Sequence, residues 1–164
     1  TWKLVRIPLG DLGVSDTIHG LVWQDATGNG VSEFKLDSIS FVQLTAPIGP
    51  APPAPKTNQV NIYFDSYESG FYSWSWGSRL NPLSYAQLHT GKASLAITHL
   101  SAWAGAYLHS DITVDTSKVN RVRFWLRAAT QKIILALVDG SGVTLAAVPL
   151  SFPANTWTET SRCY

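Results

Sequence analysis

Two short segments of this sequence place aromatic and polar side chains in alternation with small apolar ones. Residues 103–109 read WAGAYLH and residues 121–127 read RVRFWLR. Successive side chains of an extended strand point to opposite faces. We therefore expect the apolar residues of each segment to lie inside the protein. The side chains expected outside are Trp103, Tyr107, His109, Arg121, Arg123, Trp125 and Arg127.

Tryptophan is usually buried, so a tryptophan that points outward indicates a functional role. Flat aromatic rings can stack on the C–H face of a sugar, while charged and amide groups bind its hydroxyls. In LVWQD at 21–25, Trp23 and Asp25 share a face with Leu21 and either join this surface or cap the core. The predicted carbohydrate-binding residues are Trp103, Tyr107, His109, Arg123, Trp125, Arg127, Trp23 and Asp25. The alternative, packing under loops or in the core, is the one we expect for Trp2, Trp74 and Trp157.

Nothing in the sequence has the spacing of a catalytic site. The GxSxG, HExxH, P-loop and GxGxxG motifs are missing from it, and its four histidines lack metal-ligand spacing. A glycosidase needs two carboxyl groups across a cleft. Asp25 could face Asp111 or Asp139 in this way, but such pairs arise by chance, and turn residues are the simpler interpretation. We predict a protein that is not an enzyme and has no catalytic residues.

Composition narrows the class of protein further. The 164 residues suffice for one domain, and the net charge of +1 does not favour binding to nucleic acid. With 14% charged and 12% aromatic residues, the chain is typical of an all-β domain. No apolar run approaches the ~20 residues of a membrane span, and the single Cys163 excludes a disulfide framework. We therefore expect neither a nucleic-acid nor a membrane partner.

The distribution of apolar residues predicts a β-sandwich. Residues 45–57, TAPIGPAPPAPKT, predict an extended connector. Residues 80–88 could form a short turn of helix. The segments that predict strands are residues 2–7, 21–25 and 34–41 before the connector, and 60–64, 72–76, 93–99, 102–109, 121–128, 133–139 and 144–149 after it.

Several motifs resemble those of jelly-roll carbohydrate-binding modules, of which families 4, 11 and 22 are similar. FDSYESG at 64–70, WSW at 74–76 and HTGKASL at 89–95 resemble the opening of such modules. WKLVRIPL at 2–9, GLVWQD at 20–25 and FKLDSI at 34–39 resemble their last strands but come first here. The resemblance implies one antiparallel jelly-roll β-sandwich in circularly permuted order. Residues 1–44 would be its C-terminal strands, 45–57 the linker and 58–164 its N-terminal strands.

The rotated order suggests parts of two tandem modules. The connector could join the last strand to the first within one chain, or the halves could pair between two chains as a strand-swapped homodimer. NTWT at 155–158 echoes TWK at 1–3, so residues 157–162 would compete with 2–7 for one position. Residues 2–7 alternate better, and we expect 158–164 to be frayed or out of register. We expect any export signal to lie outside this sequence.

The same resemblance implies a structural Ca²⁺, because related jelly rolls hold one near their first and last strands. The matching positions are the side chains of Glu68 and Asp37 and the main-chain oxygens of His89 and Lys92. Side-chain and main-chain oxygens are the ligands that calcium prefers. The alternative is that Asp65 and Glu68 cap a surface turn.

The function implied is that of a non-catalytic module that binds β-glucan, cellulose or xylan-type plant polysaccharide for a secreted enzyme. Weak contacts at several subsites would add up along the polymer. We expect an extracellular location. The leading alternative is a structural β-sandwich repeat of an extracellular adhesin or surface fibre. In that case a loop or a neighbouring chain would cover the face that bears Trp103 and Trp125.

Overall fold

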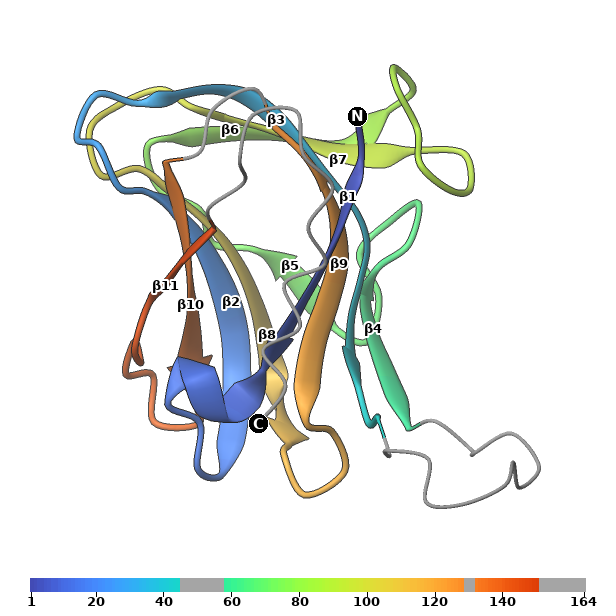
Figure 1. Ribbon diagram of the computed structural model, residues 1–164, viewed down its shortest axis with the longest axis vertical. Helices are drawn as coiled ribbons and strands as arrows, with labels where there is room; N and C mark the ends of the chain where they lie inside the picture. Colours follow the sequence, from blue (N-terminus) through green and yellow to red (C-terminus); the bar gives the residue numbers. More distant parts are fainter. Residues whose placement is uncertain (45–57, 129–131, 151–164) are drawn as a thin grey trace.

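The computed structural model describes residues 1–44, 58–128 and 132–150. Two antiparallel sheets pack face to face as a sandwich (Figure 1). The all-β sandwich predicted from the sequence is therefore confirmed. In the described part of the chain, no helix is long and apolar enough to cross a membrane.

Sheet A contains six strands, with the order β1–β9–β3–β7–β6 and with β4 also paired to β3. The long strand β3 pairs with β9 along one edge, while its other edge pairs first with β7 and then with β4. The bounds are β1 Lys3–Pro8, β3 Val31–Val42, β4 Gln59–Tyr63, β6 Ser78–Ser84, β7 Ser94–His99 and β9 Arg121–Arg127.

Sheet B contains five strands in the order β11–β10–β2–β8–β5. A short 3₁₀ helix, η1 (Leu9–Leu12), connects β1 of sheet A to β2 of sheet B. The bounds are β2 Thr17–Asp25, β5 Phe71–Ser73, β8 Gly105–Asp115, β10 Ile133–Asp139 and β11 Val148–Leu150.

The first 44 residues are part of both sheets. Strand β1 pairs with β9, β2 lies between β10 and β8, and β3 pairs with β4, β7 and β9. Each of these strands thus pairs with a strand from the later part of the chain. Such pairing is needed because three strands cannot form a sandwich alone. The predicted connector at 45–57 and the predicted fraying of 158–164 lie outside the described residues.

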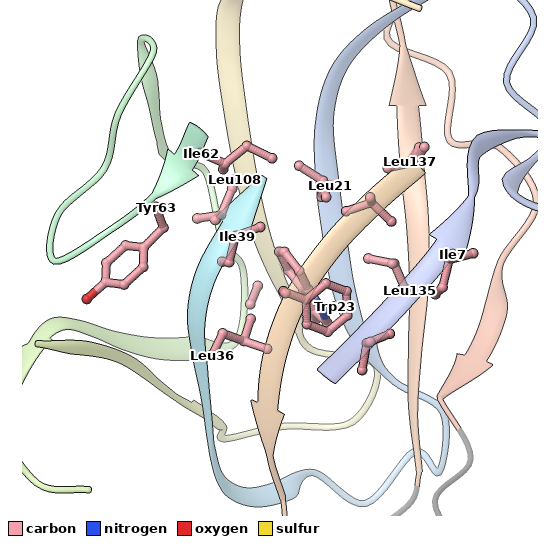
Figure 2. Packing of buried hydrophobic residues seen from close by; sticks show 14 of the residues in the cluster. Ile7, Leu21, Trp23, Leu36, Ile39, Ile62, Tyr63, Leu108, Leu135 and Leu137 are labelled. Atoms are coloured by element: carbon pink, nitrogen blue, oxygen red, sulfur yellow. The ribbon is translucent and has the colours of Figure 1, made fainter. Parts of the chain in front are cut away.

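Alternating apolar side chains from both sheets fill the space between them. In β9, Val122, Phe124 and Leu126 are buried and belong to the core. Trp23 of β2 is fully buried, and its ring meets that of Phe124 edge-to-face at 5.4 Å between centroids. Figure 2 shows Trp23 among Leu135 and other aliphatic side chains of the core. Burial of these side chains supplies the main favourable contribution to folding.

The prediction of a helical turn at 80–88 is wrong. Residues Ser78–Ser84 form β6, which pairs with β7. Leu80 packs against the core, whereas Arg79 and Asn81 are exposed, so this segment has the strand period of two. Its Pro82 is tolerated because β6 is an edge strand, where one side needs no ladder hydrogen bonds.

Candidate functional site: an aromatic face on sheet B

The residues predicted to form one binding surface lie on opposite sides of the sandwich. Strand β8 belongs to sheet B and β9 to sheet A, so the chain changes sheets between them. Tyr107 and His109 therefore lie on the outer face of sheet B, and Arg123, Trp125 and Arg127 on that of sheet A. The prediction that these residues form a single surface is wrong. The alternation of side chains separates inside from outside but does not reveal which sheet a strand joins.

Trp23 and Asp25 are not on any outer face. Both have 0% exposed surface, so neither can contact a ligand, and their inclusion in the binding set is a second correction. The Asp25 carboxylate accepts hydrogen bonds from Thr27 N at 2.8 Å, Thr27 Oγ1 at 2.7 Å and Gly30 N at 3.0 Å. Trp23 and Asp25 are buried because they share the inward face of β2 with Leu21.

Asp25 fixes the turn on which one exposed tryptophan rests. Burial disfavours its charged form, but hydrogen bonds from Thr27, Gly30 and the main chain of Trp103 outweigh this and lower its pKa to about 2. The carboxylate is therefore ionised at neutral pH. The Trp103 ring lies against Gly28 in the same turn.

Outward side chains of β5 and the residues after it lie beside those of β8. The pairing of Tyr72 with His109 continues to a bridge between Trp76 and Gly105. The Trp74 ring stacks on the His109 ring at 3.9 Å and 11°. Tyr72 meets both of these rings edge-on. A continuous set of aromatic rings thus covers this end of sheet B.

Two glycines let these rings lie close to the sheet. A Cβ atom at Gly105 would lie 2.3 Å from the Trp76 ring, and one at Gly20 would lie 2.5 Å from the Tyr107 ring. A side chain at Gly105 would push the Trp76 ring outward, and one at Gly20 would clash both with the Tyr107 ring and with the Leu108 carbonyl oxygen, 2.3 Å away. These positions allow the close approach only because glycine has no Cβ atom.

Trp103 completes the face from a loop rather than from the strand expected at 102–109, because β8 begins at Gly105. Its carbonyl oxygen accepts hydrogen bonds from Trp76 Nε1 at 2.9 Å and Gln24 Nε2 at 3.1 Å. The exposed fractions are 60% for Trp103, 55% for Trp74 and 45% for Trp76. We refer to Tyr72, Trp74, Trp76, Trp103, Tyr107 and His109 as the aromatic face.

A polar chain borders the aromatic face. Tyr107 Oη lies 2.9 Å from His109 Nδ1, and His109 Nε2 lies 3.2 Å from Asp111 Oδ1. Tyr72 Oη donates to the same carboxylate oxygen at 2.9 Å. The hydrogen bond from Tyr72, followed by that from His109, lowers the pKa of Asp111. Asp111 is 75% exposed and provides an ionised acceptor at the edge of the face.

Sequence reasoning missed Trp74, which was expected to pack inside, and did not single out Tyr72 or Trp76. A signal was present in YSWSW at 72–76, where small serines alternate with aromatic residues. That alternation has the same period as the one in β8. Trp2 does pack, edge-on against His89 at 5.8 Å, and Trp157 lies outside the described residues.

Trp125, on the outer face of sheet A, is covered by a loop. The His89 ring stacks on it at 3.7 Å and 20°. Trp2 in turn packs edge-on against His89. Trp125 is therefore half-buried and offers no open platform like that of Trp103.

The residues expected to hold Ca²⁺ are close together in part, but their polarity does not fit the ion. Asp37 accepts hydrogen bonds from His89 N and Thr90 N, both at 3.1 Å. Asp65 likewise accepts from Lys92 N at 2.7 Å and from the next amide. The loop thus presents N–H groups to the carboxylates, where calcium would need carbonyl oxygens. In the described ranges, no group of three His, Cys, Asp or Glu side chains is placed so that it could hold a metal ion, and this is also true of groups that include Glu68.

The carboxylates considered as a glycosidase pair have other contacts. Asp25 is buried in its turn, and Asp139 Oδ1 accepts hydrogen bonds from Ser141 N at 2.9 Å and Val143 N at 2.8 Å. Side-chain acceptance from amides further along the chain is the usual role of aspartate in turns.

No protein-family model, curated protein or solved structure significantly matches this chain. The resemblance to jelly-roll carbohydrate-binding modules therefore stays a prediction.

Proposed function

We propose that this domain is a non-catalytic module that binds an extended polysaccharide of neutral sugars, of the β-glucan, cellulose or xylan type, through the aromatic face. The observation that carries the proposal is that Trp74, Trp76 and Trp103 are each about half exposed, and that the Trp76 N–H is bonded to the main chain of Trp103. Exposed apolar patches of this kind on an otherwise packed protein mark binding surfaces.

The rings are held in place before any ligand arrives. Trp74 rests on His109, and the Trp76 N–H is already bonded to the Trp103 carbonyl. Because each ring has one face against the protein, its other face is available for stacking on a sugar. Little conformational entropy is then lost on binding, which favours affinity.

The backbone at Trp103 supports the same interpretation. Its φ of 60° lies in the left-handed region, which bulky residues seldom adopt. Such strain persists where the surrounding structure holds the residue in a conformation useful for function. Here the turn fixed by Asp25 holds Trp103, and the strained backbone projects its indole ring into solvent.

Polar groups at the border can bind sugar hydroxyls. Asp111 is an exposed acceptor, and Gln24 and Tyr72 provide amide and phenol groups close to the rings. Aromatic stacking flanked by a few fixed polar groups is the combination that sugar recognition requires. We place the domain in a secreted, polysaccharide-active protein, as the sequence resemblance implies.

Affinity electrophoresis in gels containing hydroxyethylcellulose, mixed-linkage glucan, xyloglucan or xylan tests the proposal. We expect at least one polymer to retard the protein and Trp74→Ala and Trp103→Ala to abolish the retardation. Tyr85→Ala is the matched control, because Tyr85 is 71% exposed and lies outside the aromatic face. Unretarded migration with all four polymers would contradict the proposal. Concentration-dependent association lost in Trp74→Ala would favour the structural repeat instead.

A further inference from the structure

The strands of the two sheets differ in the charges that they carry. Sheet A has lysine or arginine residues in β1, β3, β6 and β9. The strands of sheet B, on which the aromatic face lies, contain neither. Apart from histidines, the charged residues in the strands of sheet B are Asp25, Asp111, Asp115 and Asp139. These strands therefore contribute carboxylates and no permanent positive charge.

Asp111 is the aspartate of this set that borders the aromatic face. Asp25 is buried, and Asp139 accepts hydrogen bonds within its own turn. Asp115, at the far end of β8, forms an ion pair with Lys118 at 3.4 Å. These contacts leave Asp111 as the carboxylate of this set that can reach a ligand on the aromatic face.

Asp111 and the Trp74 ring are held by the same two side chains. Asp111 Oδ1 accepts a hydrogen bond from Tyr72 Oη at 2.9 Å and lies 3.2 Å from His109 Nε2. The Trp74 ring stacks on the same His109 ring and meets Tyr72 edge-on. A sugar that stacks on the open face of Trp74 therefore lies close to the carboxylate of Asp111.

The negative charge of Asp111 is open to a ligand. Both contacts above involve Oδ1, and from the described residues Oδ2 accepts no hydrogen bond. Asp111 is 75% exposed, and the hydrogen bond from Tyr72, followed by that from His109, lowers its pKa. It is therefore ionised at neutral pH. Lys132, directly before β10, lies at the other end of sheet B, where its carbonyl oxygen accepts a hydrogen bond from Ala26 N.

We propose that Asp111 sets the charge selectivity of the aromatic face. The position over Trp74 favours a sugar with an ammonium group over a neutral sugar, and a neutral sugar over an acidic one. Both the carboxylate and the electron-rich face of the indole attract an ammonium group. The carboxylate of an acidic sugar is repelled by Asp111, with no strand lysine or arginine of sheet B to offset the repulsion. This inference rests on the proposed glycan binding and names the charge class of the glycan.

Tryptophan fluorescence titrations of the full chain with three polymers of one backbone test this proposal. Hydroxyethylcellulose is neutral, carboxymethylcellulose is acidic and quaternised hydroxyethylcellulose is cationic. At pH 8 and an ionic strength of about 0.01 M, we expect wild type to bind the acidic polymer about threefold more weakly than the neutral one. It should bind the cationic polymer about threefold more tightly. A factor of about three corresponds to two unit charges about 6 Å apart in water. The net charge of +1 would by itself favour the acidic polymer, so the expected order differs from that of a non-specific contact.

The reading is the ratio of dissociation constants between polymers. Asp111→Asn should bring both ratios close to one, because asparagine keeps an acceptor for Tyr72 but loses the charge. Asp11→Asn is the control, since it removes the same charge from the exposed residue of η1, outside both sheets, and it should keep the wild-type ratios. An ionic strength of about 1 M, where the Debye length is about 3 Å, should also bring the wild-type ratios close to one without any substitution.

The outcomes separate this inference from the proposed function. Binding of the neutral polymer with the same ratios in wild type and Asp111→Asn would overturn the role of Asp111 and leave glycan binding intact. Tighter binding of the acidic polymer than of the neutral one by wild type would do the same. A fluorescence signal unchanged by all three polymers would overturn the proposed function and this inference with it.

Discussion

Replacement of Asp25 by asparagine should destabilise the protein and weaken glycan binding, although Asp25 cannot touch a ligand. The carboxylate accepts hydrogen bonds from Thr27, Gly30 and the main chain of Trp103, which lower its pKa from 3.8 to about 2. At 1.36 kcal/mol per pH unit, this fall corresponds to about 2 kcal/mol of folding free energy at pH 7. Because Asp25 is fully buried, solvent screens little of this contribution to the folding free energy.

The pH dependence of this effect has a definite sign. The folded-state pKa lies below the unfolded value, so the unfolded chain binds the proton first as the pH falls. The stabilisation by Asp25 is therefore complete above about pH 4 and is lost toward pH 2. Asp25→Asn, which cannot ionise, should be less stable than wild type by about 2 kcal/mol at pH 7, and the difference should shrink below pH 4.

Urea unfolding followed by tryptophan fluorescence at pH 7, 5, 4 and 3 measures this difference. Asp11→Asn is the matched control, because Asp11 is exposed in η1 and should change stability by less than about 0.5 kcal/mol. Retardation of Asp25→Asn by glycan should also decrease, because the turn under Trp103 loosens. Equal stability of Asp25→Asn and wild type at pH 7, or a difference that stays constant down to pH 3, would refute the reasoning.

Three further changes test the fold and the site. Trp23→Ala should lower the free energy of unfolding by about 3–5 kcal/mol, measured by urea unfolding, because it removes a fully buried indole; a smaller loss with abolished glycan binding would return Trp23 to the site. Gly105→Ala should displace the Trp76 ring, shift its fluorescence to the red and reduce glycan retardation while the chain still folds. EDTA should leave the melting temperature unchanged, since amide donors occupy Asp37; a decrease of several degrees, reversed by Ca²⁺, would show that the loop binds the ion.

Much of the local structure could be predicted from the sequence. The alternation in 121–127 and 133–139 correctly predicted strands β9 and β10 with these bounds or within one residue of them. It also predicted that Arg123 and Trp125 point away from the core, and Tyr107 away from Leu108. These features are local, because the side-chain period of two is fixed by the backbone of each strand alone.

The composition of the site could not be predicted in the same way. Whether Tyr107 and Trp125 share a face depends on which sheet each strand joins, and that depends on pairing between residues far apart in the chain. The same holds for the turn that buries Asp25 and for the conformation of Trp103. Trp23 obeys the alternation of β2, but only the packing of Phe124 from the other sheet shows that its face is the core.

The amino-acid sequence by itself determined that the chain forms strands and which side chain of each strand is turned inward, because these follow from short-range periodicity. Only the tertiary structure decided which aromatic rings gather on one surface and which carboxylates hold loops rather than ligands. Both depend on contacts between distant segments, whose free energy is gained only when the two sheets pack together.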